Sequence, residues 1–115
     1  MHLCYFDENK HGPDNPHFFI GGVLIPDAKA IQFESTLSQI VFNFSGSRSL
    51  TKANELHGKD LFHGKGNAKG RKIADRVRVF EDVATFITDN NIPVRMACIN
   101  VERHKQKYKY PEPPY

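Results

Sequence analysis

Two acidic residues near the N-terminus, Asp7 and Glu8, follow an apolar run and are the first side chains that could do chemistry. The run from Leu3 to Phe6 is apolar on both faces of a strand, which predicts a place in the middle of a covered sheet. Asp7 then emerges at the carboxyl end of that strand, where ligands gather in open α/β sheets. A carboxylate there predicts a divalent-metal site, and the alternative is an acidic, solvated turn.

A second polar cluster occupies residues 55–72. Glu55 and His57 are two residues apart, so they share one side of an extended chain. Five cations follow among four glycines. Glycine lets backbone N–H groups approach an anion closely, and a helix is predicted to begin at about residue 68. The candidate phosphate ligands are Lys59, Lys65 and Arg71. The alternative is a flexible basic loop before a solvated helix start.

Asp7 and Glu55 together predict more specific chemistry. Two carboxylates brought together across a sheet can hold Mg²⁺ or Mn²⁺, with water and a substrate phosphate completing the shell. Such ions support phosphodiester cleavage, in which His57 could orient a water or a leaving group. The alternative is that Glu55 is a solvated loop acid and His57 a surface histidine. Glu102 is a weaker third acid, and the histidine spacing predicts no zinc site.

The elements that must position these residues follow from periodicity. Strands are predicted at 3–6, 18–25 and 94–101, the first two antiparallel because their connection is short. Gly21-Gly22 predicts a bulge or a close backbone approach. Asp27 can cap a first helix, and a second helix runs to about residue 89. The region 48–66 is predicted to be irregular, with one short strand around 55–62. The predicted buried faces of the two helices are Phe33, Leu37, Ile40, Val41 and Phe44, and Ile73, Val77, Phe80, Ala84 and Ile87.

Composition bounds the class of protein. The chain has 115 residues, enough for one domain, and its 39% hydrophobic and 25% charged residues are typical of a globular protein. With the strands and helices above, this predicts one α/β domain over 1–103 and a basic, proline-rich tail over 104–115. A net charge of +3 does not by itself indicate nucleic-acid binding. Cys4 and Cys98 are predicted to be small buried hydrophobes, as in a reducing cytoplasm. No signal peptide or membrane span is predicted, so the expected location is cytoplasmic. A thin sheet predicts a two-fold homo-oligomer, or the front part of a larger domain.

Three stretches carry a resemblance to a known family: residues 3–8 (LCYFDE), 19–26 (FIGGVLIP) and 55–58 (ELHG). They resemble the "domain of unknown function 3800" family, over the front half of a typical member. The resemblance implies a ribonuclease H-like mixed sheet with two flanking helices, incomplete in this chain, and metal-dependent nuclease activity. Asp7 and Glu8 match the acid pair of the family, and Glu55 and His57 match its second motif. The implied metal ligands are Asp7, Glu8 and Glu55.

Two departures from the family pattern are visible. Asn9-Lys10 replaces the usual Ser-Gly, and the later acidic motif has no counterpart. The leading hypothesis is a metal-dependent phosphodiester hydrolase acting on nucleic acid, with Asp7, Glu55 and His57 as the catalytic residues and Mg²⁺ or Mn²⁺ as the cofactor. The alternatives are a non-catalytic nucleic-acid or protein interaction module, and an inactive fragment of a longer enzyme.

Overall fold

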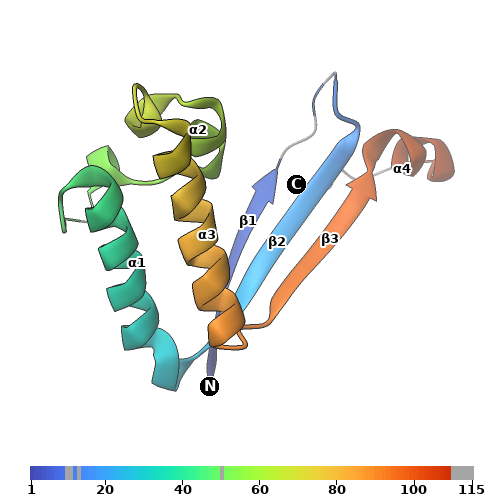
Figure 1. Ribbon diagram of the computed structural model, residues 1–115. Helices are drawn as coiled ribbons and strands as arrows, with labels where there is room; N and C mark the ends of the chain where they lie inside the picture. Colours follow the sequence, from blue (N-terminus) through green and yellow to red (C-terminus); the bar gives the residue numbers. More distant parts are fainter. Residues whose placement is uncertain (10–11, 13, 50, 110–115) are drawn as a thin grey trace. The chain divides into compact units, whose positions relative to one another are not determined.

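The computed structural model describes residues 1–9, 12, 14–49 and 51–109, so the proline-rich end of the predicted tail lies outside the described residues. The described part is a mixed α/β structure with a three-stranded antiparallel sheet and four α-helices (Figure 1). The elements are β1 (His2–Asn9), β2 (His17–Pro26), α1 (Ala30–Ser45), α2 (Gly58–His63), α3 (Ile73–Asp89), β3 (Val94–Asn100) and α4 (Val101–Lys107). None of the helices formed by the described residues is long and apolar enough to cross a membrane.

The chain divides into two compact units, each with its own contacts. The sheet unit comprises Met1–Asp27 and Ile92–Tyr115, and the helical unit comprises Ala28–Asn91. The sequence-based division into a domain over 1–103 and a tail over 104–115 stays a prediction.

The sheet has the order β1-β2-β3, so β2 is its middle strand. The two early strands are confirmed as an antiparallel pair, joined in an unbroken register from His2↔Pro26 to Asn9↔Phe19. The prediction that the first strand lies between two neighbours is wrong for the described residues, since β1 is at the edge. The apolar residues on the two faces of β1 are not buried as in a central strand, because Tyr5 and Phe6 remain 57% and 65% exposed.

Gly22 of β2 explains part of the apolar character of β1. A Cβ at this position would collide with the ring of Phe6, which lies over the bare backbone of its cross-strand partner. The predicted close approach is therefore confirmed at Gly22 but not at Gly21, and the continuous register excludes a bulge at either residue. An aromatic ring over a strand glycine replaces the packing that the glycine lacks.

The first helix, α1, buries the predicted face. Ile40, Val41 and Phe44 are buried, and Ile40 and Phe44 join Leu61, Ala68 and Val79 in the core of the helical unit. Gly46 ends the helix in the left-handed conformation with φ of 79°, and its N–H donates to the Phe42 carbonyl at 2.8 Å. The N-cap of α1 is Lys29 rather than the predicted Asp27, which begins a single 3-10 turn instead.

The second long helix, α3, begins five residues later than predicted, because Gly70 (φ of 77°) and the extended Lys72 keep the preceding segment out of the helix. The prediction of its buried face is also wrong. Val79 and Phe86 are the buried residues, and Phe86 packs against the ring of Phe33 on α1 with centroids 5.4 Å apart.

Three further corrections concern local structure. The short strand predicted around 55–62 is instead the helix α2, whose Leu61 is buried. The third strand stops at Asn100, whose side chain accepts a hydrogen bond from Arg103 N at 2.9 Å and so begins the unpredicted helix α4. Cys4 and Cys98 do lie in strands but are free and exposed rather than buried.

Candidate functional site

The predicted pair of Glu55 and His57 is brought together in the helical unit. Both residues have extended backbone, and the Nε2 atom of His57 lies 3.5 Å from Oε2 of Glu55. The two side chains are 55% and 59% exposed, so they face solvent rather than the core. The same-side arrangement predicted from their spacing is confirmed. It presents a carboxylate and an imidazole to any ligand that approaches this surface.

The basic loop, defined as residues 58–72, is built from short ordered turns and not from irregular chain. Helix α2 ends at Gly64 (φ of 65°), where the N–H of Lys65 donates to the Asp60 carbonyl at 2.9 Å. A second turn follows, in which Ala68 N donates to Lys65 O at 2.9 Å and Ala68 is buried. These turns hold the exposed cations on a defined backbone.

Gly66 has two reasons to be glycine. Its φ of 51° is left-handed, which side chains rarely adopt. A Cβ there would also collide with the carboxylate of Asp60. From the sequence, the glycines of this segment are predicted to bring backbone N–H groups close to an anion. At Gly66 the close approach is to the protein's own carboxylate.

Two side chains that the sequence analysis did not single out order the basic loop. Arg76 of α3 donates through Nη1 to the carbonyls of Leu61 (2.8 Å) and Phe62 (3.1 Å), at the end of α2. Asn67 donates through Nδ2 to the Glu55 carbonyl at 2.9 Å, which ties the loop to the Glu55–His57 segment. Neither residue has a sequence signal that separates it from a solvated polar residue.

The predicted phosphate ligands differ in their surroundings. Lys59 and Lys65 are exposed, on α2 and just after it. The guanidinium of Arg71 instead stacks over the ring of Phe44, 5.2 Å from its centroid. Arg71 also lines a hollow of about 460 Å³ that contains both charge signs; its charged residues are Arg71, Asp75, Arg78 and Asp82. Arg71 is thus the most constrained of the three.

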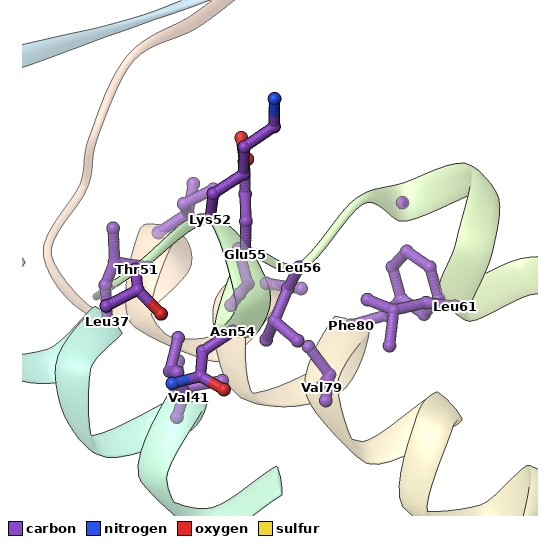
Figure 2. Close-up of a pocket in the computed structure, with 15 residues that line it drawn as sticks. Leu37, Val41, Thr51, Lys52, Asn54, Glu55, Leu56, Leu61, Val79 and Phe80 are labelled. Carbon is purple, nitrogen blue, oxygen red and sulfur yellow. The ribbon is translucent and has the colours of Figure 1, made fainter. Parts of the chain in front are cut away.

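A larger pocket of about 800 Å³ lies next to the Glu55–His57 pair, between α1, α3 and the segment that joins α1 to α2. Its walls are mainly aliphatic, with Leu56, Leu61, Val79 and Phe80 among the lining residues (Figure 2). The side chains of Lys52 and Glu55 point in the same direction from that segment in Figure 2. A volume of this size matches small-molecule sites.

Asp7 and Glu8 lie inside β1 rather than beyond its end. Asp7 pairs with Gly21 and Glu8 with Ile20, and β1 continues to Asn9. Neighbouring residues of a strand point to opposite faces of the sheet, so the two carboxylates are on different faces. Asp7 is exposed, and its cross-strand partner Gly21 has no side chain that could contact it. Its Oδ1 accepts a hydrogen bond from the N–H of Glu8 at 2.9 Å.

Asp7 belongs to the sheet unit and Glu55 to the helical unit, so their convergence at one ion stays a prediction. In the described part of the chain, no three or more Asp, Glu, His or Cys side chains gather as a metal would require. The weaker candidate, Glu102, lies in the first turn of α4 and pairs with Lys105 at 3.5 Å.

Comparisons with known proteins identify no relative. A scan against protein-family models finds no match, and searches of curated proteins and of solved structures find no significant match either.

Proposed function

We propose that this protein is a metal-dependent phosphodiester hydrolase that acts on nucleic acid. We also propose that it belongs to the domain of unknown function 3800 family, with a ribonuclease H-like arrangement as the finer form of its mixed α/β fold. One observation supports the function best: an exposed carboxylate–imidazole pair, Glu55 and His57, adjoins an ordered loop with five cations in the same unit.

Each residue of the site has a proposed role. Lys59 and Lys65 are exposed and can hold phosphates of the substrate backbone, where charge-assisted contacts are strong. The imidazole of His57 can accept a proton from an attacking water or donate one to a leaving oxygen. Asp7 and Glu55 supply the hard oxygen ligands of the proposed ion. When bound, Mg²⁺ or Mn²⁺ would stabilise the negative charge on a phosphoryl oxygen and lower the pKa of a water molecule.

A thermal melt with and without Mn²⁺ tests the metal. A cation that binds only the folded state stabilises it by about 2.7 kcal/mol at 100 times its dissociation constant. We expect this shift to disappear in Asp7→Asn and to shrink in Glu55→Gln. Glu8→Gln is a matched control one residue away on the opposite face, and it should retain the shift. An unshifted parent melt, or an equal loss in Glu8→Gln, would contradict the proposed ligands.

A nuclease assay on single- and double-stranded DNA and RNA tests the activity. Cleavage that needs Mn²⁺ and is lost in His57→Ala, with unchanged nucleic-acid affinity, is the expected result. Cleavage that persists in both Asp7→Asn and His57→Ala preparations would come from a contaminant and would count against the proposal.

The basic loop also favours a second candidate, a nucleic-acid-binding module without catalysis. The logarithm of the binding constant falls linearly with the logarithm of the salt concentration, and each phosphate that a cation neutralises adds roughly 0.7–0.9 to the magnitude of this slope. Lys65→Ala should therefore reduce the magnitude of the salt slope by about that amount for any sequence. Salt-dependent binding with no metal-dependent cleavage would favour this candidate over the hydrolase.

A further inference from the structure

The outer edge of β1 has a defined hydrogen-bonding pattern. Met1, just before β1, and Asp27, just after β2, lie opposite each other, and Asp27 N donates to Met1 O at 3.2 Å. They therefore form a hydrogen-bonded pair of the antiparallel ladder. Bonded pairs alternate along antiparallel strands, so Leu3, Tyr5 and Asp7 direct their N–H and C=O groups toward β2. The residues that direct these groups outward are His2, Cys4, Phe6 and Glu8. In the described part of the chain, no strand pairs with this edge.

This edge lacks most of the features that usually protect an open strand. Natural edges are short, or carry charged side chains (lysine above all), proline or a bulge, and the acids of β1, Asp7 and Glu8, lie only near its carboxyl end. β1 is eight residues long, contains neither lysine nor proline, and has a continuous register with β2. Its central residues are apolar and exposed, with Tyr5 at 57% and Phe6 at 65%. The edge is therefore suited to take another strand.

We propose that this strand is β1 of a second copy of the chain, paired antiparallel across a two-fold axis at Tyr5. Each outward-directed residue must lie opposite an outward-directed residue of the other copy, so that the two can exchange hydrogen bonds. Because these residues alternate along β1, the two-fold axis must pass through a residue and cannot pass between two neighbours. Only an axis at Tyr5 pairs the whole strand, from Met1 with Asn9. It also places His2 opposite Glu8 on the same face, twice by symmetry, which is a favourable pair when the imidazole is charged.

The charge pattern of β1 selects this direction. In a parallel pair, Asp7 and Glu8 would lie beside their own copies, and like charges destabilise a strand pair. In the antiparallel pair, the acidic ends lie at opposite ends of the interface. The product is a closed dimer with a continuous six-stranded sheet of order β3-β2-β1-β1-β2-β3 and isologous contacts. The two Asp7 residues are then roughly 13 Å apart along the strands, so the dimer neither needs nor creates a shared metal site.

The other open edge, β3, offers a competing arrangement. An antiparallel pairing of β1 of one copy with β3 of the next, in the register that places Tyr5 opposite Ala97, also places Asp7 opposite Arg95. It is a head-to-tail contact that generates open chains unless a ring closes. Pairing β3 with itself brings no opposite charges together. The experiment therefore has to separate the closed dimer from the head-to-tail chain.

Disulfide trapping separates them in a Cys4→Ser, Cys98→Ser background. Residues at Tyr5 would form a non-hydrogen-bonded pair with Cα atoms about 4.5 Å apart. That distance lies within the roughly 4.4–6.8 Å range of disulfides. Tyr5→Cys should therefore form a covalent dimer under mild oxidation, whereas the exposed control Met96→Cys should not. A mixture of Tyr5→Cys and Ala97→Cys chains that forms mixed disulfides instead would establish the head-to-tail chain and overturn the proposal.

Sedimentation of Cys4→Pro gives a second, independent test. The N–H of Cys4 points outward, so proline there removes an edge donor without removing a bond to β2. Tyr5→Pro is the matched variant that does remove such a bond and should destabilise the sheet. We expect the parent to sediment as a dimer and Cys4→Pro as a folded monomer with an unchanged circular dichroism spectrum. A monomeric parent at high concentration, or a Cys4→Pro variant that remains dimeric, would refute the interface.

Discussion

Arg76 positions the basic loop, and its replacement by alanine is the sharpest test of how that loop is held. The guanidinium donates to the carbonyls of Leu61 and Phe62 at 2.8 and 3.1 Å, so it closes the end of α2 against α3. Gly64 lies directly against this guanidinium, because a Cβ there would come within 3.0 Å of Nη1. Removal of the side chain therefore leaves two carbonyls without this donor and opens a gap beneath the turn.

The expected cost follows from the burial of the two bonds. A hydrogen bond to a charged group contributes about 1.5–3 kcal/mol, and the bond to Leu61 is part-buried. The bond to Phe62 is exposed and adds less. The Nε of Arg76 is buried without a partner among the described residues, which reduces the net gain. We expect Arg76→Ala to lower the free energy of unfolding by about 2 kcal/mol. This change corresponds to a melting temperature about 8 °C lower.

The measurement is a urea titration of three variants beside the parent. Arg78→Ala removes the same charge from the same helix two residues away, and among the described residues the Arg78 side chain forms no hydrogen bond. This variant should stay within about 0.5 kcal/mol of the parent. Arg76→Lys keeps the charge but not the planar fork, so it should recover only part of the loss. Equal stability of Arg76→Ala and Arg78→Ala would refute the positioning role of Arg76.

Three further variants test local features of the fold by thermal or urea unfolding. Gly66→Ala should destabilise by about 1–2 kcal/mol from its left-handed φ alone, and by more because the new Cβ meets the Asp60 carboxylate; an unchanged midpoint would contradict this. Gly22→Ala must displace the Phe6 ring and should cost about 1–3 kcal/mol, a loss that Phe6→Ala in the same chain should reduce. Asn100→Ala removes the cap of α4 and should cost about 1 kcal/mol with a loss of helical circular dichroism, whereas Asn100→Asp should retain both.

The parts of the fold that the sequence predicted correctly are those fixed by local chemistry. The second strand follows from an apolar run that stops at Pro26, and its antiparallel pairing with the first strand follows from the short connection between them. The edge position of β1 was beyond such reasoning. Strand order depends on which strands pair across long stretches of sequence. A short apolar run has the same sequence pattern in an edge strand and in a central strand of a sheet.

The error on α3 has a specific cause, because this helix carries two overlapping apolar stripes. Ile73, Val77 and Phe80 keep the spacing of one face, yet they are 70%, 46% and 42% exposed. The stripe of Val79, Val83 and Phe86 keeps the same spacing and packs inward. Periodicity alone cannot choose between two faces that are both apolar. Phe80, Ala84 and Ile87 of the first stripe line the 800 Å³ pocket instead.

The candidate site shows how far residue spacing determines side-chain direction. Two residues at a spacing of two share a side when the backbone is extended, and this rule placed Glu55 beside His57 at 3.5 Å. Asp7 and Glu8 are adjacent, so the same rule sends them to opposite faces of the sheet once the strand is found to continue to Asn9. Their interpretation as joint ligands depended on a turn directly after Asp7. An ion on the face of Asp7 must therefore take its other protein ligands from residues other than Glu8. Ligation by Asp7 and Glu55 together stays a prediction, because the two residues belong to different units.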